Sequence, residues 1–152
     1  MEPRSIIEEP LILLVDDDIR TARLLARLLE DDGFRVELAT DGAFAIARLA
    51  RTPVPDILVT DFRMPHADGI AVARFARSLR PDLPLFVLTG YPELVARLGR
   101  GLVPEAVVHT KPVDYSALSA ELRSSVEAVS SSAARAQPSA AAPGPLPSPI
   151  PA

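Results

Sequence analysis

Short apolar runs are the feature that most limits how this chain can fold. Residues 11–15, 57–60 and 85–88 read LILLV, ILVT and LFVL, and Thr60 is their one polar residue. Runs of this length suit strands, and continuous apolar character is typical of strands that are covered on both faces of a parallel sheet. Two more strands are predicted at residues 34–39 and 105–109. In the first of these, apolar residues alternate with charged ones, which indicates an edge strand with one wetter face.

Segments with helical spacing of apolar residues separate the predicted strands. Predicted helices cover residues 19–31, 41–52, 69–79 and 92–98, and a last one begins near Asp114. Five alternations of strand and helix predict an α/β fold, a doubly wound five-stranded parallel sheet with helices on both faces. The chain has 152 residues, of which 48% are hydrophobic and 24% charged, and this suffices for one such domain.

The composition divides the chain into three parts. We predict an N-terminal extension at residues 1–10 and a folded domain at residues 11–129. Residues 130–152 are almost entirely Ser, Ala and Pro and contain six of the 16 prolines. Such a segment buries too little apolar surface to offset its chain entropy, so we expect a disordered tail. A proline-rich docking peptide is an alternative use of this tail.

Composition also excludes several classes of function. Without cysteine, the chain has no disulfide, no thiol nucleophile and no thiolate metal site. A net charge of -4 gives no general attraction to nucleic acid or to anionic membranes. The start of the chain, MEPRSIIEEP, does not read as a signal peptide, and no apolar run approaches the roughly 18 residues of a membrane span. We therefore expect a soluble, cytoplasmic protein that binds neither nucleic acid nor membrane.

Polar residues follow four of the predicted strands at the point where each strand ends. They are Asp16 and Asp17, then Asp61, Thr89 and Lys111. Each alone has a simpler explanation, as a helix cap, a turn residue or a solvated cation. Because the carboxyl ends of parallel strands meet at one edge of a sheet, where ligands bind in open α/β folds, their joint occurrence indicates a site.

The charges of this set predict its chemistry. Carboxylates about 4 Å apart repel by about 4 kcal/mol per pair at an effective dielectric constant of 20. Lys111 offsets part of this repulsion, and a divalent cation offsets more, since carboxylates and water suit Mg²⁺. The cation and Lys111 would neutralise a phosphoryl group, and Thr89 would donate a hydrogen bond to it. Asp61 is then the group placed to attack phosphorus, as carboxylates do in aspartyl-phosphate enzymes.

Several motifs follow one another along the chain in a recognisable order. They are LLVDDD at residues 13–18, Asp61 with Met64-Pro65 and Asp68-Gly69, Leu88-Thr89-Gly90 and Lys111-Pro112. With these motifs the chain resembles, over residues 11–129, the receiver domain of bacterial two-component response regulators, here of the type without an output domain. The resemblance implies a flavodoxin-like strand order, 2-1-3-4-5.

The resemblance implies a role for each acid in binding Mg²⁺. Asp17 and Asp61 would bind the ion directly, together with the backbone carbonyl of Arg63. Asp16 would act through a metal-bound water.

The resemblance also implies how the phosphoryl group is received. Asp61 would accept it from a phosphohistidine on a sensor histidine kinase or a phosphotransfer protein. Lys111 would pair with it, and Thr89 would move toward it. The changed surface, formed by the fourth helix, fifth strand and fifth helix, would then bind a downstream protein. The chain would be a signalling switch rather than an enzyme, catalysing only its own phosphorylation and dephosphorylation.

One position departs from the family pattern. Three residues before Lys111, where receivers usually carry Tyr or Phe, the chain has Val108, which cannot make the inward swing of an aromatic ring. Tyr91 is the nearest aromatic residue to Thr89 in sequence. We hypothesise that Tyr91, with Arg63 beside it, covers the phosphorylation site and controls the access of water. The alternative is that Tyr91 is a surface residue of the loop.

Two other functions use the same residue types. A phosphatase of the haloacid-dehalogenase type would use Asp16 and Asp18 as its acid pair and Asp16, rather than Asp61, as its nucleophile. Such enzymes need a further acidic pair after the lysine, where only Glu121 and Glu127 follow on a predicted helix. The third possibility is an adaptor with the receiver shape that is never phosphorylated.

The remaining polar residues are given structural roles. Asp18 is interpreted as a helix-start residue that favours the helix dipole. His66 and His109 are interpreted as loop or strand-end residues rather than phosphoryl relays. The arginines of residues 20–27 are interpreted as a solvated helix face.

Overall fold

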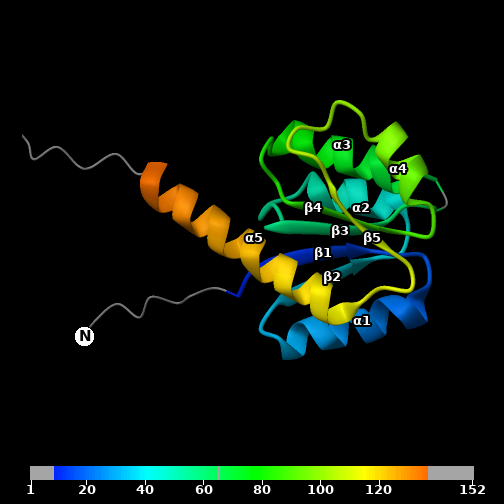
Figure 1. Cartoon of the computed structure of the whole chain (residues 1–152), viewed down its shortest axis with the longest axis horizontal. Helices are drawn as coiled ribbons and strands as arrows, with labels where there is room; N and C mark the ends of the chain where they lie inside the picture. The colour runs from blue at the N-terminus through cyan, green and yellow to red at the C-terminus, as the bar shows by residue number, and fades with distance from the viewer. Residues whose placement is uncertain (1–8, 65, 137–152) are drawn as a thin grey trace, which may run out of the picture.

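A computed structural model describes residues 9–64 and 66–136, with the backbone alone for residues 129–136. Five parallel strands form one sheet in the order β2-β1-β3-β4-β5, which confirms the predicted topology. Strands and helices alternate along the chain, as Figure 1 shows. The strands are β1 (Leu11–Val15), β2 (Arg35–Ala39), β3 (Ile57–Asp61), β4 (Leu85–Thr89) and β5 (Val107–Thr110); the helices are α1 (Ile19–Asp31), α2 (Gly42–Leu49), α3 (Gly69–Leu79), α4 (Pro92–Leu98) and α5 (Tyr115–Ala136).

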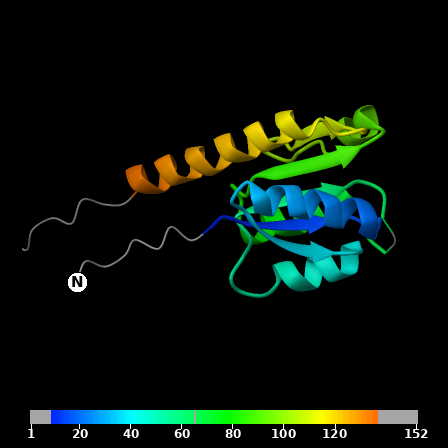
Figure 2. The ribbon, with the colours of Figure 1, turned by 90° about the horizontal axis from the view of Figure 1, so that it is seen from below.

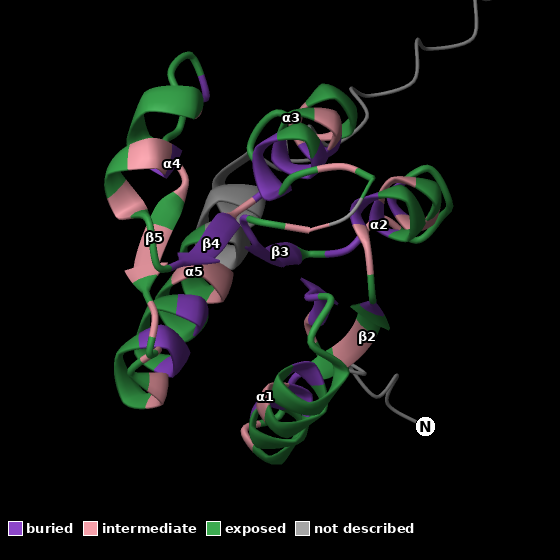
Figure 3. Ribbon diagram, turned by 90° about the vertical axis from the view of Figure 1, so that its right-hand side faces the viewer, coloured by how far each residue is buried: buried purple, intermediate pink, exposed green. Residues whose placement is uncertain are grey.

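Helices cover both faces of the sheet, as the sequence predicts. Residues of α1 and α5 pack against one face, and residues of α2 and α3 against the other. A smaller cluster between β4, α3 and α4 continues the second face. Figure 3 shows the sheet between these layers, with α1 and α5 on one side and α2 and α3 on the other. Among the described residues, no helix combines the length and the apolar character needed to span a bilayer.

Burial of the strands follows their sequence patterns. β1, β3 and β4 are buried along their whole length, in agreement with their continuous apolar runs. β2 lies at the edge of the sheet and is only partly buried, which confirms the predicted edge strand. The predicted difference between a dry apolar face and a wet charged face is not seen, since Leu38 is exposed while Val36 and Glu37 are both partly buried.

Carboxylates begin four of the helices. Asp18, Asp41, Asp68 and Asp114 precede α1, α2, α3 and α5, and each accepts a hydrogen bond from the backbone N–H three residues later. These bonds satisfy donors that the first helical turn leaves free. After α1, Gly33 has a φ of +96°, the left-handed conformation that glycine adopts without strain. The caps therefore fix where the chain leaves each strand and enters the following helix.

Helix α5 continues past the predicted boundary at residue 129 and ends at Ala136, so residues 130–136, which were predicted to be part of a disordered tail, are helical. The reason is local: this segment is made of Ser, Ala and Arg, with no proline before Pro138, and extending a helix is far easier than starting one. Figures 1 and 2 show the end of α5 projecting beyond the sheet. Residues 137–152 and 1–8 lie outside the described part, so the predictions for them stay predictions.

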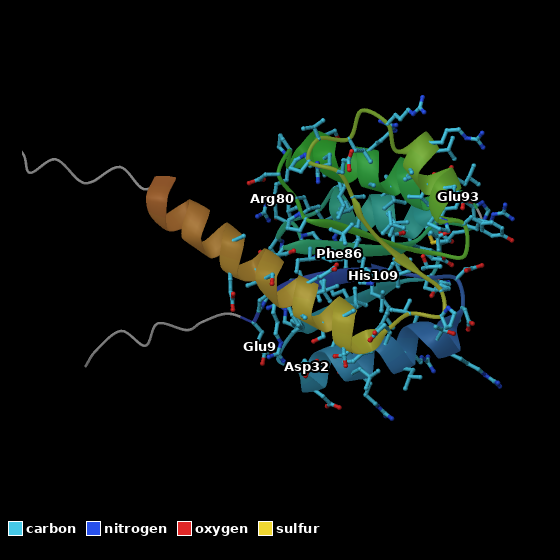
Figure 4. The ribbon with its side chains drawn as sticks, viewed as in Figure 1. Glu9, Asp32, Arg80, Phe86, Glu93 and His109 are labelled. Atoms are coloured by element: carbon cyan, nitrogen blue, oxygen red, sulfur yellow. The ribbon has the colours of Figure 1, made fainter. Side chains whose placement is uncertain are left out.

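The start of α5 is fastened to the end of α1 by a hydrogen-bonded cluster. The Tyr115 hydroxyl lies 2.8 Å from the carbonyl oxygen of Leu28 and also contacts the Asp32 carboxylate. Ser119 Oγ donates to Asp32 Oδ2 at 2.9 Å, and Arg123 Nη2 lies 3.2 Å from Asp32 Oδ1. Asp32 is labelled in Figure 4 beside the first turns of α5. The cluster joins two helices that are far apart in sequence.

The cluster also shifts the acidity of both partners. Burial and the bond to Asp32 raise the pKa of Tyr115 to about 12. Hydrogen bonds from Tyr115 and then Ser119 lower the pKa of Asp32 below its ordinary value. The folded state thus favours a neutral tyrosine facing an ionised carboxylate.

We expect Tyr115→Phe to lower the free energy of unfolding at pH 7 by about 0.5–1.5 kcal/mol, the usual net value of a hydrogen bond. The depressed pKa of Asp32 stabilises the fold above the unfolded pKa, and this contribution is lost as pH falls through the folded value. The raised pKa of Tyr115 contributes fully below pH 10 and is lost as pH rises toward about 12. The difference in free energy of unfolding between wild type and variant should therefore become smaller at low and at high pH, as measured by urea titrations. Tyr91→Phe, at the only other tyrosine, is the matched control; an equal loss there would contradict the assignment.

Candidate functional site

The carboxyl ends of the strands bring the predicted site residues to one edge of the sheet. Asp16 follows β1, Asp61 ends β3, Thr89 ends β4 and Lys111 follows β5. The register supports this, since Asp61 pairs with Leu88 and Thr89 with Thr110 along the ladders. Figure 3 looks onto this edge, toward which the strand arrows of Figure 1 point.

Three carboxylates converge there. Asp16, Asp17 and Asp61 each offer one oxygen, and these oxygens all lie within 4.8 Å of one another. Asp16 is buried, Asp61 keeps 9% of its surface exposed and Asp17 is exposed. Side chains from two separate loops therefore form one acidic cluster that opens to solvent on the side of Asp17.

The pKa of Asp16 reflects both its burial and the charges around it. Burial raises the pKa of Asp16, and the neighbouring charges of Asp61 and Asp17 raise it further. The backbone N–H of Asp18, which donates to Asp16 Oδ1 at 2.9 Å, and the charge of Lys111 act in the opposite direction. The protein alone does not fully neutralise the acids, so an oxygen-binding cation such as Mg²⁺ fits this donor set.

Asp61 is held in one orientation by two donors. The backbone N–H of Phe62 donates to Asp61 Oδ1 at 2.8 Å, and Lys111 Nζ lies 3.2 Å from the same oxygen. Within the described part of the chain, Asp61 Oδ2 accepts no hydrogen bond. One oxygen therefore fixes the side chain and the other is left for chemistry.

The loop after β3 packs directly against the backbone of Asp61. A Cβ atom at Gly69 would lie 2.3 Å from the carbonyl oxygen of Asp61, so glycine is required there. The backbone N–H of Gly69 also donates to the carbonyl of Phe62 at 2.8 Å. Within this loop His66 has a φ of +71°, an uncommon conformation for a residue with a side chain. The start of α3 therefore lies directly beside Asp61.

Thr89 is buried and is engaged by its own loop. Its Oγ1 accepts a hydrogen bond from the backbone N–H of Tyr91 at 2.8 Å, and its carbonyl accepts one from the N–H of Lys111 at 2.8 Å. No hydrogen bond joins Thr89 to Asp61 among the described residues. Thr89 and Lys111 are therefore linked through the ladder, while the hydroxyl of Thr89 points to its own turn.

Arg63 and Tyr91 stack on each other across neighbouring loops. The guanidinium carbon of Arg63 lies 4.2 Å from the centre of the Tyr91 ring, a cation–π geometry. Tyr91 nevertheless keeps 51% of its surface exposed. The structure therefore brings together the two residues that the sequence hypothesis paired, one from the loop after Asp61 and one from the loop after Thr89.

Val108 leaves space where a larger side chain would fit. It is partly buried on β5 and packs against the cluster that contains Val87 and Val95. It also lines a hollow of about 260 Å³ between α4 and β5, together with Gly99 and Leu102. The side chain of Val108 therefore belongs to a small apolar core, and it cannot make the movement expected of an aromatic ring at this position.

Other candidates lie outside the acidic cluster. Asp18 accepts hydrogen bonds from the backbone N–H and the hydroxyl of Thr21, at 3.3 and 2.7 Å, so it is the cap of α1. His109 Nε2 lies 2.8 Å from Glu121 Oε2 on α5, and its ring stacks on Phe86 with ring centres 6.3 Å apart (Figure 4). Sequence reasoning missed the pairing of His109 with Glu121, because nothing in the sequence relates positions on two separate elements.

Comparisons with known proteins agree with this geometry. A family model described as the response regulator receiver domain matches residues 12–123. Response regulator MprA of Mycobacterium leprae (strain TN) is 45% identical over 87 residues, which cover 57% of this chain and 38% of that protein. Photosynthetic apparatus regulatory protein RegA of Rhodovulum sulfidophilum is 35% identical over 122 residues, which cover 80% of this chain and 66% of that protein. The chain thus spans less than two fifths of the first relative's length and about two thirds of the second's.

Solved structures show the same fold. The signal receiver domain of an HD domain-containing protein from Pseudomonas fluorescens Pf-5 has a TM-score of 0.76 at 25% identity, covering 89% of this chain and 99% of that one. Chemotaxis response regulator CheY4 of Vibrio cholerae has a TM-score of 0.68 at 26% identity, covering 77% and 98%. A response regulator receiver protein from Sinorhizobium medicae WSM419 has a TM-score of 0.68 at 33% identity, covering 79% and 93%.

We expect Asp16→Asn to stabilise the metal-free protein at pH 7, by on the order of 1 kcal/mol, because it removes a buried charge beside two others. Because the pKa of Asp16 is raised, its ionisation destabilises the fold as pH rises above the ordinary value of 3.8, so the gain of the variant should disappear as pH falls below that value. Urea unfolding at several pH values in EDTA measures this effect. Addition of Mg²⁺ should stabilise the wild type more than the variant. A variant that is less stable than wild type without metal would contradict this account of the cluster.

Proposed function

Because the chain belongs to the family of response regulator receiver domains, we propose that it is a signalling switch of two-component systems that accepts a phosphoryl group on Asp61. The observation that carries the proposal is the convergence of Asp16, Asp17 and Lys111 on Asp61. The family match covers residues 12–123, which include all four positions.

Asp61 has the geometry of a nucleophile. A carboxylate oxygen attacks phosphorus of a phosphohistidine on the donor, forming an O–P bond while the N–P bond breaks and the imidazole leaves with the electron pair. The bonds of Phe62 N–H and Lys111 Nζ to Oδ1 hold the carboxylate in place, which leaves Oδ2 as the attacking atom. Little acid–base chemistry is needed in phosphoryl transfer, so positioning and charge account for most of the rate.

The acidic cluster is the proposed site for Mg²⁺. Asp17 and Asp61 would hold the ion with the backbone carbonyl of Arg63, and Asp16 would act through a bound water. When bound, Mg²⁺ supplies the positive charge that the phosphoryl oxygens need. Lys111 would contribute a further positive charge, and its bond to Asp61 is made in the structure already.

Switching begins with the charge of the phosphoryl group, about two negative units by analogy with phosphoserine. The phosphoryl oxygens attract the hydroxyl of Thr89. This hydroxyl would leave its hydrogen bond with the N–H of Tyr91 and donate a hydrogen bond to the phosphoryl group instead. Moving a two-state switch from mostly off to mostly on takes about 5.5 kcal/mol of differential interaction. The bonds to Thr89 and Lys111 are the proposed source, and the ladder between them carries the change to β5 and α4. The surface of α4, β5 and α5 is the proposed site for a downstream protein.

A hollow beside the acids gives the phosphodonor a place to dock. It has a volume of about 410 Å³ and extends from Asp16 and Lys111 to the apolar Leu25 and Leu28 and to Tyr115. A histidine kinase or a phosphotransfer protein that packs an apolar helix face here brings its phosphohistidine to the acidic cluster. No role of nucleic acid, membrane or a further catalytic activity is proposed, and the cytoplasm is the proposed location.

The two alternatives are less well supported. In a phosphatase of the haloacid-dehalogenase type Asp18 would act in the site, but here its carboxylate caps α1 through Thr21. An adaptor that is never phosphorylated would not need two further acids, Asp16 and Asp17, and a lysine arranged around the Asp61 carboxylate. Binding of beryllofluoride with Mg²⁺, read from amide shifts of Thr89 and Lys111, separates the adaptor from the switch.

We expect the purified protein to incorporate phosphate from acetyl phosphate only with Mg²⁺, and Asp61→Asn to abolish this completely. Mass spectrometry with peptide mapping should place the label on Asp61. Asp18→Asn is the matched control, since asparagine caps a helix about as well as aspartate and the position lies outside the cluster. Labelling of Asp16, or full labelling in EDTA, would refute the proposed function.

We expect Tyr91→Ala to shorten the lifetime of the acyl phosphate about two- to five-fold, the factor that corresponds to an exposed cation–π contact of about 0.5–1 kcal/mol. The ring and Arg63 together shield the site from water, so the lifetime after removal of the donor is the measurement. Tyr91→Phe keeps the ring and should keep the lifetime. An unchanged lifetime in Tyr91→Ala would show that the residue is only part of the surface.

A further inference from the structure

The outer margin of β2 presents free backbone groups. In the sheet β2 pairs only with β1, and the N–H of Arg35 and the carbonyl of Ala39 are bonded to residues of that side. Because successive residues of a strand turn their N–H and C=O groups to opposite sides, Val36 and Leu38 direct theirs away from the sheet. No described strand lies on that outer side to bond these outward N–H and C=O groups. Figure 3 shows β2 at the margin, between α1 and α2.

Exposed apolar side chains lie on both sides of this margin. Leu38 is 42% exposed, Leu24 on α1 is 63% exposed and Phe44 on α2 is 65% exposed. Two hollows meet at Leu38, one of about 440 Å³ toward α1 and one of about 300 Å³ toward α2. Edge strands in proteins are commonly protected by charge or cover, whereas this one has an exposed leucine between two hollows.

The charges around the two hollows are mainly positive. Four arginines and two glutamates line them: Arg23, Arg27, Arg48, Arg51, Glu30 and Glu37. Glu37 is paired with Arg48, whereas Arg23, Arg27 and Arg51 form no ion pair within the described part of the chain. A basic surface on a chain with a net charge of -4 is complementary to an acidic partner.

We propose that the outer margin of β2 binds an extended acidic segment of a partner protein as a sixth strand of the sheet. Neighbouring side chains of an added strand point to opposite faces, so two successive apolar residues would fill the two hollows. Carboxylates on either side of them would lie beside the free arginines. A second copy of this chain fits less well, since a two-fold contact would face the arginines of one copy with those of the other. Nucleic acid would leave the apolar hollows and the backbone groups unused.

This surface does not involve Asp61, so the inference goes beyond the proposed function and does not rest on it. The probe is a fluorescently labelled peptide, Glu-Glu-Leu-Leu-Glu-Glu with blocked ends, titrated with the full chain and followed by anisotropy. We expect binding with shifts of the Val36 and Leu38 amides in NMR spectra. A Lys-Lys-Leu-Leu-Lys-Lys peptide should bind at least ten-fold more weakly.

Variants test the surface itself. Leu38→Lys and, separately, the pair Arg23→Glu with Arg27→Glu should each weaken the acidic peptide at least ten-fold, with circular dichroism confirming the fold. Leu79→Lys is the matched control, since Leu79 is 45% exposed on α3, outside this surface, and Asp61→Asn should also bind normally. Equal binding of the two peptides, or no shift at Val36 and Leu38, would overturn the proposal. Stronger binding of an eight-nucleotide oligothymidine at the same amides, or dimerisation in light scattering that Leu38→Lys abolishes, would overturn it in favour of nucleic acid or a second copy.

Discussion

Repulsion among three carboxylates at the end of the sheet is the unfavourable interaction that the rest of the fold has to offset. Asp16 and Asp61 are withdrawn from water while Asp17 stays exposed beside them, and Lys111 is the one cation in contact with Asp61 among the described residues. Burial, and then the charges of Asp61 and Asp17, raise the pKa of Asp16, which indicates that its ionised form is unfavourable there. Such a cluster is held together only because the surrounding strands and loops are stable without it.

That stability comes from parts of the molecule that take no part in the chemistry. The central strands are buried on both faces, and fully burying an apolar side chain contributes about 1.5–3 kcal/mol. Leu118 and Leu122 secure α5 against the same core, and the cluster of Tyr115 and Asp32 aligns it with α1. The backbone of Asp61 is itself packed closely, because Gly69 lies directly against its carbonyl.

Much of this arrangement was predictable from the sequence, and the reasons differ between features. The runs LILLV and LFVL are typical of strands in a sheet covered on both faces, and parallel strands then bring Asp16, Asp61 and Lys111 to one edge. The helical state of residues 130–136 was not predicted, because helix extension depends on neighbouring turns as well as on composition. The cluster of Tyr115 with Asp32 and the pairing of His109 with Glu121 join elements whose relative rotation no local pattern specifies.

Val108 changes how a signal can travel from the acids to the far surface. In a domain with an aromatic ring at this position, side-chain movement can couple the site to the surface of α4 and β5; here the valine is packed beside a hollow and has no such movement. The connection that remains is the backbone, where the N–H of Lys111 donates to the carbonyl of Thr89. Any displacement of Thr89 therefore acts on β5 directly, through a hydrogen bond of the sheet. In the proposed switch the relative position of these two strands would therefore carry the change, while Val108 stays packed in its small core.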